Sequence, residues 1–238
     1  MQQLKEINVD DDKIINISPR SIVVVADATF FSRVEGLLIF REPNLKQNLI
    51  WKEIHVETAG QYEQLKLGLE SKGFTIKAVV LDGRPGVREI FHNIPTQMCH
   101  FHQVAIIRRY LTGRPKLSAG KELFEIAKSI TKSDEKTFSD LLSVWHDKWQ
   151  EFLKEKTINP FTGQWFYTHK RLRAAFRSLK NNLPYLFTYQ KLPELRIPNT
   201  TNSLDGYITT LKNFIRIHRG IQKEKRTKII NQILKSIP

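Results

Sequence analysis

Residues 21–27 read Ser-Ile-Val-Val-Val-Ala-Asp, a continuous apolar run that ends on an acidic side chain. A short run without polar alternation is typical of a strand that is buried on both faces. Residues 77–82, Lys-Ala-Val-Val-Leu-Asp, repeat the pattern. Burying an acid beside such a run is costly unless a cation or a hydrogen-bond donor meets it. The two runs therefore predict strands that end in Asp27 and Asp82, although Asp82-Gly83 is also a common turn pair.

Further predicted elements surround these strands in a definite order. Residues 37–40 and 49–54 follow as strands with short connections, which favours an antiparallel meander. The remaining predictions are helices over residues 60–72, 87–91 and about 101–111, and a strand over residues 96–99. This order resembles the ribonuclease H-like fold, an α/β fold with a mixed five-stranded sheet flanked by helices. In that fold the first and fourth strands are neighbours, so Asp27 and Asp82 are expected to meet.

The chain divides into four predicted segments. Residues 1–20 are a polar tail or linker, and residues 21–114 form the first part of the core. Residues 115–192 show helical periodicity with almost no strand signal, which predicts an all-helical insertion. Residues 193–238 form the last part of the core with a basic helix. Within the insertion, residues 165–167 (Trp-Phe-Tyr) are interpreted as helix-packing core, with stacking on unpaired bases as the alternative.

The basic helix carries a third acid, Asp205. Asn202 is predicted to cap this helix, with Asp205 at its third position, where the helix dipole favours an acid. At about 100° per residue, four cations fall within about 40° of Asp205: Lys212, Arg216, Arg219 and Lys223. An apolar stripe lies about a quarter-turn away: Leu204, Ile208, Leu211 and Ile215. The helix is expected to pack on the sheet and to present Asp205 with cations beyond it.

The 238-residue chain has 38 Lys and Arg against 24 Asp and Glu, a formal net charge of +14. Such an excess favours a polyanionic partner, because each cation that meets a phosphate releases a counterion. Cys99 is the single cysteine, which excludes an intrachain disulfide and a four-cysteine zinc site. Neither an apolar run of about 18 residues nor a secretory signal is present, so a cytoplasmic protein without a membrane partner is expected.

Three carboxylates at element ends suit two-metal chemistry. Two cations about 4 Å apart can stabilise the attacking and leaving oxygens of an in-line phosphoryl displacement. Hard cations such as Mg²⁺ or Mn²⁺ prefer carboxylate oxygens. Asp27, Asp82 and Asp205 are therefore the candidate catalytic and metal-binding residues, with Asp27 in the shared position. For Asp27 the alternative is a strand-end acid at the solvent edge.

Four ordered blocks support this interpretation: Val-Val-Val-Ala-Asp27-Ala-Thr-Phe-Phe, Val-Val-Leu-Asp82-Gly-Arg-Pro-Gly, Met-Cys99-His-Phe-His102-Gln and Asn199-Thr-Thr-Asn-Ser-Leu-Asp205-Gly. Between about residues 20 and 220, the chain resembles the Mutator-type insertion-sequence transposases of the DDE superfamily. The resemblance implies a bacterial, nucleoid-associated enzyme with a ribonuclease H-like catalytic domain. Such an enzyme uses two divalent cations to cut and join double-stranded DNA at transposon ends and target, and generally works as a homodimer.

The resemblance also assigns residues. The first two acids map onto Asp27 and Asp82, and the family's cysteine-two-residue-histidine signature maps onto Cys99 and His102. That pair is interpreted as a brace for the active-site strand and next helix or as a DNA contact, because two ligands do not make a tetrahedral zinc site. The third acid of the family is usually Glu, whereas Asp205 is one methylene shorter. The predicted DNA-binding cations are Arg84, Arg88, Lys170, Arg171, Arg173, Lys212, Arg216, Arg219 and Lys223.

Two alternatives remain open. A catalytically altered or truncated DNA-binding protein that keeps the fold would explain Asp205, and residues 1–20 are too short for the recognition region that family members usually carry ahead of the catalytic domain. A ribonuclease or Holliday-junction nuclease would use the same acids. Metal-dependent cleavage and substrate comparison separate the three hypotheses.

Overall fold

The computed structural model describes residues 18–217 and 220–235. One sheet contains β1 (Ser21–Phe30), β2 (Gly36–Glu42), β3 (Gln47–Ile54), β4 (Thr75–Leu81) and β5 (Thr96–Met98). The helices are α1 (Ala59–Ser71), α2 (Val87–Ile90), α3 (His100–Leu111), α4 (Ser118–Ser129), α5 (Glu135–Lys154), α6 (Lys170–Leu186), α7 (Thr188–Lys191), α8 (Asn202–Ile217) and α9 (Lys223–Lys235). Across the described ranges, none of these helices has the length and apolar character needed to cross a bilayer.

The main sheet has the strand order β3-β2-β1-β4-β5, with β1 at its centre. Strands β1, β2 and β3 are antiparallel, whereas β4 and β5 run parallel to β1. This is the predicted mixed five-stranded sheet. The first strand is longer than predicted, because its pairing with β2 continues beyond the apolar run through Asp27 to Phe30.

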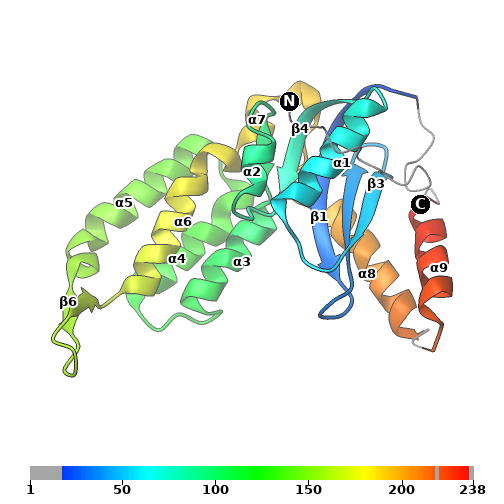
Figure 1. Cartoon of the computed structure of the whole chain (residues 1–238). Helices are drawn as coiled ribbons and strands as arrows, with labels where there is room; N and C mark the ends of the chain where they lie inside the picture. Colours follow the sequence, from blue (N-terminus) through cyan, green and yellow to red (C-terminus); the bar gives the residue numbers. More distant parts are fainter. Residues whose placement is uncertain (1–17, 218–219, 236–238) are drawn as a thin grey trace, which may run out of the picture.

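Side chains of β1 alternate between two apolar cores, as expected for a strand that is buried on both faces. Val24 and Ala26 pack in the core that α1 and α2 cover. Val23 and Val25 pack in the opposite core, which α8 and α9 cover. Helices therefore lie on both sides of the sheet, as Figure 1 shows.

Helix α8 packs on the sheet through the predicted stripe. Leu204, Ile208 and Leu211 are buried, and Ile215 packs partly against the same core. The helix ends at Ile217. The predicted line of cations beyond Asp205 is therefore wrong in its last part, because Lys223 begins the separate helix α9. Arg219 lies outside the described residues.

The insertion is not entirely helical. Strands β6 (Lys156–Ile158) and β7 (Trp165–Tyr167) pair antiparallel between α5 and α6. The Asn159 side chain accepts hydrogen bonds from the backbone at 161 (2.9 Å) and 162 (3.3 Å), and Gly163 adopts φ +66°. Asx turns and a positive-φ glycine reverse the chain, so a hairpin forms instead of a helix. The prediction that Trp165, Phe166 and Tyr167 form helix-packing core is therefore wrong.

Candidate active site

The sheet register brings Asp27 and Asp82 together. Val25 of β1 pairs with Val80 of β4, an offset of 55 residues, and the same offset separates Asp27 from Asp82 (82 − 27). Adjacent strands lie about 4.8 Å apart. Because side chains alternate, both acids are on the side of the sheet that carries Val25 and Val80, under α8. Two acids far apart in sequence are thus brought together, Asp27 within β1 and Asp82 directly after β4.

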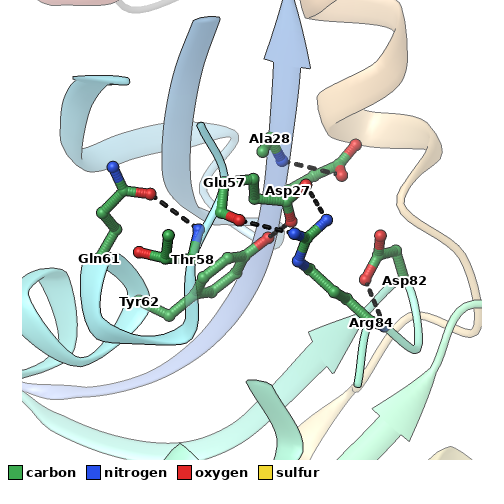
Figure 2. Close-up of polar contacts among 8 residues, drawn as sticks. All are labelled: Asp27, Ala28, Glu57, Thr58, Gln61, Tyr62, Asp82 and Arg84. Atoms are coloured by element: carbon green, nitrogen blue, oxygen red, sulfur yellow. Dashed lines mark hydrogen bonds and ion pairs between the residues drawn. The ribbon is translucent and has the colours of Figure 1, made fainter. Parts of the chain in front are cut away.

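Asp27 lies inside β1 and not at its end, because the strand continues to Phe30 and Asp27 pairs with Ile39 of β2. Its side chain is only 8% exposed, and Oδ1 accepts a 2.9 Å hydrogen bond from the Ala28 backbone, as shown in Figure 2. The pKa of Asp27 is raised to about 7, mainly by burial. The charge of His102 lowers this pKa, and the charges of Asp82 and Asp205 raise it, so both other predicted acids act on Asp27.

Asp82 is half-buried directly after β4. Its Oδ1 accepts a 2.9 Å hydrogen bond from the Arg84 backbone, which closes the turn seen in Figure 2. Gly83 has φ +86°, and a Cβ there would collide with the Met98 side chain. Asp82 therefore serves both interpretations made from the sequence: it closes a glycine turn, and its position beside Asp27 adds a second acid to the site.

Asp205 is tied to the end of the sheet through Cys99. The Thr201 hydroxyl donates a 2.9 Å hydrogen bond to Asp205 Oδ2 and lies 3.4 Å from the Cys99 sulfur. The Cys99 amide bonds the Leu81 carbonyl at the end of β4 (2.8 Å). Thr201 also accepts the first backbone hydrogen bond of α8, from the Asp205 amide (3.0 Å). The prediction that Asn202 caps the helix is therefore wrong, since Asn202 already lies in the first turn.

His102 completes a buried polar network with Cys99. Hydrogen bonding to Cys99 raises the pKa of His102 to about 9, burial opposes this, and the charges of Asp27 and Asp82 add to it. Burial tends to raise the pKa of Cys99, but its interactions with His102 and Thr201 outweigh burial and lower it. A protonated imidazole is thereby placed near two acids. The cysteine and histidine connect β5, α3 and α8 around those acids, which is the geometry of a brace.

Glu57 is a fourth acid at this site, and sequence reasoning missed it. It precedes Thr58, which forms a capping box with Gln61 at the start of α1. Tyr62 donates a 2.8 Å hydrogen bond to Glu57 Oε1, and Arg84 bonds its Oε2 at 2.9 Å, as Figure 2 shows. Burial raises the pKa of Glu57, Tyr62 lowers it, and the charge of Asp82 raises it. The Thr-x-x-Gln spacing marks this helix start, but nothing local indicates that it lies beside Asp82.

The two arginines after Asp82 have partners within the chain. Arg84 forms its ion pair with Glu57 while remaining 40% exposed at its side chain. Arg88 lies over the Tyr185 ring at 3.8 Å and donates to Asn182 Oδ1 at 3.0 Å. Arg88 therefore joins the sheet domain to helix α6 of the insertion. Of the two, Arg84 lies closer to the acids.

The predicted cations of the insertion surround the hairpin. Lys170 lies 4.7 Å from the Phe166 ring, and Arg173 lies 3.6 Å from the Tyr167 ring. Arg171 donates to a backbone carbonyl at the end of α3 (2.7 Å). On α8, Lys212 and Arg216 are exposed. The structure thus separates the predicted cations into a group on the insertion and a group on the helix of Asp205.

The donors at the site suit a hard cation, because Asp27, Asp82, Asp205 and Glu57 supply only carboxylate oxygens. Burial is the main cause of the raised pKa of Asp27, so a bound cation would favour the ionised carboxylate there. In this conformation, however, the described residues contain no group of three or more His, Cys, Asp or Glu side chains close enough to hold a metal ion. Metal binding would therefore require the carboxylates to turn toward one another from positions that the backbone already brings near.

Comparison with models of protein families gave no match, and comparison with curated proteins gave none either. The function is therefore inferred from the geometry of the site and the charge of the chain.

Proposed function

We propose that this chain is a DNA phosphodiester-transferring enzyme of the DDE transposase type, with a ribonuclease H-like catalytic fold. The observation that carries the proposal is geometric: the register of β1 and β4 brings Asp27 beside Asp82, and Thr201 and Cys99 join Asp205 to the end of β4. The strand order is compatible with the proposed fold. The net charge of +14 favours a polyanionic substrate.

The acids would hold two divalent cations, Mg²⁺ or Mn²⁺, which supply Lewis-acid chemistry for an in-line phosphoryl displacement. Asp27 is partly protonated near neutral pH in the absence of a cation, because its pKa is about 7. Cation binding would release that proton, since the ligand must be ionised. Thr201 engages one oxygen of Asp205, and Cys99 holds Thr201 in place. The exposed cations Lys212 and Arg216 follow Asp205 on α8, where they can meet DNA phosphates.

The experiment is cleavage of supercoiled plasmid and labelled duplex DNA with Mg²⁺, Mn²⁺ or EDTA. Asp27→Asn, Asp82→Asn and Asp205→Asn are compared with Asp140→Asn, a change on an exposed part of α5. Metal-dependent nicking that each site variant reduces by about 10³-fold, equivalent to several kcal/mol, is expected. Full activity in a folded Asp27→Asn variant refutes the assignment.

The second candidate is a DNA-binding protein that keeps the fold without catalysis. The absence of a gathered metal-ligand group in the described residues favours it, as does the short Asp205. This candidate predicts duplex binding with a steep salt dependence, no change in thermal stability with Mg²⁺ or Mn²⁺, and no cleavage. Parallel assays with RNA–DNA hybrid and four-way junction DNA test for a ribonuclease or junction nuclease.

A further inference from the structure

The β6–β7 hairpin exposes apolar side chains that no neighbouring element covers in the described structure. Phe161 is 96% exposed, Ile158 67%, Trp165 54% and Phe166 37%. Figure 1 shows the hairpin at the end of the insertion that is remote from the main sheet. Ile158 and Trp165 pair across the hairpin and share one face, whereas Phe166 lies on the other face. Exposed apolar side chains grouped on one segment typically mark an interaction site.

Cations accompany the aromatic rings. Lys156 lies 3.9 Å from the centre of the Trp165 ring, and Lys170 lies 4.7 Å from that of Phe166. Rings that stack on bases beside cations that meet phosphates are the usual components of a site for single-stranded nucleic acid.

The chain from the hairpin through α6 carries one sign of charge, and the nearest acid, Glu155, precedes the hairpin and pairs with His169 (2.9 Å). Residues 156–193 contain no Asp or Glu and these Lys and Arg residues: Lys156, Lys170, Arg171, Arg173, Arg177, Lys180 and Lys191. Four of them are spaced by three, four and three positions along α6 and therefore share one helix face: Lys170, Arg173, Arg177 and Lys180. A surface groove of about 380 Å³ follows this face, and its described lining includes Lys154 and no acidic residue. Charge complementarity therefore favours a polyanion.

The groove adjoins a larger cleft that reaches the turn after Asp82 and whose lining includes Glu89. Asn181 lines both the groove and this cleft, which has a volume of about 830 Å³ and lies between α6 and that turn. Gly83, Arg84 and Tyr185 line that cleft as well. From Lys170 to Tyr185 the helix rises about 22 Å, which is long enough to follow several nucleotides of one strand. One strand could therefore run from the hairpin to the turn after Asp82.

We propose that the hairpin of residues 156–167 and the basic face of α6 form a binding site for an unpaired nucleic-acid strand. Phe161, Trp165 and Phe166 stack on its bases, and Arg177 and Lys180 contact its phosphates. The proposal deepens the proposed function, on which it rests, by assigning the insertion to an unpaired strand that leads to the acid site.

The test uses the full chain in EDTA, so that binding is measured without catalysis. Fluorescence anisotropy compares a 20-nucleotide single strand, a duplex with a seven-nucleotide overhang and a blunt duplex. The Phe161→Ala/Trp165→Ala variant is expected to bind the two substrates that contain unpaired bases at least about 10-fold more weakly than wild type, since one stacked base contributes about 1–3 kcal/mol. Its affinity for the blunt duplex should fall by less than about 2-fold. The matched control is Leu141→Ala/Val144→Ala, which removes exposed apolar side chains from α5 of the same insertion.

A second variant tests the helix face. Arg177→Gln/Lys180→Gln should reduce the slope of log affinity against log salt for the single strand by about 1.4, because each phosphate contact to a single strand contributes about 0.7. Unchanged affinity of the hairpin variant for all substrates overturns the proposal, and so does an equal loss on blunt duplex. If the hairpin variant keeps its affinity for nucleic acid but loses self-association in light scattering, the hairpin contacts a second copy of the chain, and the proposal is also overturned.

The outcomes separate this proposal from the proposed function. Selective binding of unpaired strands by wild type and Asp27→Asn, without metal-dependent cleavage, supports the hairpin site and refutes the enzyme. Metal-dependent cleavage with no dependence of unpaired-strand binding on the hairpin supports the enzyme and refutes the hairpin site.

Discussion

The acid site (Asp27, Asp82, Asp205 and Glu57) and the β6–β7 hairpin differ in what they bury: the acid site buries a carboxylate, whereas the hairpin exposes apolar rings. At the sheet, a carboxylate is buried at 8% exposure, with Asp82 and Asp205 acting on it. At the hairpin, Phe161 is 96% exposed on a turn that local hydrogen bonds hold. The first arrangement depends on long-range packing, and the second depends on a few adjacent residues. Damage to packing should therefore disturb the acids strongly and the hairpin little.

The largest effect is expected from Leu204→Ala on α8. Leu204 is fully buried between α8 and the sheet, and such a truncation costs about 2–5 kcal/mol of unfolding free energy. Leu179→Ala on α6, which is equally buried in the insertion, should cost a similar amount. Only Leu204→Ala should also shift the titration of Asp27, measured by NMR of the labelled carboxyl carbon. An identical Asp27 titration in both variants would contradict the coupling of α8 to the site.

Asp27→Asn tests the cost of burying a charge. Asp27 has its pKa raised from 3.8 to about 7 in the folded state. Below pH 4 it is protonated in both states; as the pH rises to about 7 the unfolded state ionises first, so stability falls. The two pKa values set an upper limit of about 4 kcal/mol for this loss, and about 2 kcal/mol is expected.

Urea unfolding in EDTA between pH 4 and pH 8 measures that difference. Asp27→Asn should lose less stability over this range than wild type, and it should be the more stable protein at pH 8. Adding Mg²⁺ should stabilise wild type and not the variant. Parallel pH curves for the two proteins would show that Asp27 is not the titrating group.

Thr201→Val removes the hydroxyl that lies between Cys99 and Asp205. Because Thr201 is fully buried, the change should cost about 1–1.5 kcal/mol in urea unfolding. Thr201→Ser keeps the hydroxyl and serves as the matched control, with most of the hydrogen bonding retained. Equal stability of Thr201→Val and wild type would show that the Thr201 hydroxyl does not stabilise the connection between Cys99 and Asp205.

The smallest effect is expected from Phe161→Ala. An exposed side chain contributes little to folding, so the free energy of unfolding should change by less than about 0.5 kcal/mol. Thermal unfolding by circular dichroism provides the measurement. A loss above about 1 kcal/mol would mean that Phe161 packs in the folded protein, and the contrast with the acid site would then fail.

Much of the sheet could be predicted because its signals are local. Unbroken apolar runs mark β1 and β4, and the 3.6-residue stripe of Leu204, Ile208 and Leu211 marks the buried face of α8. The strand length of β1 was underestimated, because pairing with β2 carries Asp27 inside the sheet. The hairpin was missed because its Asn159 and Gly163 turn was read as part of a helical insertion, although both residues are recognisable turn formers.

The site was predictable only in part. Asp27 and Asp82 follow from two similar runs, and the register of β1 and β4 brings Asp27 beside the residue that follows β4. Glu57 could not be found, because its proximity to Asp82 depends on where α1 docks. The pairing of Arg84 with Glu57, and of Arg88 with Tyr185, likewise depends on contacts between distant segments.

The sequence by itself determined the buried strands, the amphipathic face of α8 and the strong positive charge, because periodicity and composition are properties of the chain alone. Only the tertiary structure decided which carboxylates act on one another, how Thr201 joins Cys99 to Asp205, and that the rings of the hairpin face solvent. The physical reason is that desolvation and Coulomb interactions depend on distances between side chains, and packing sets those distances across many residues of sequence.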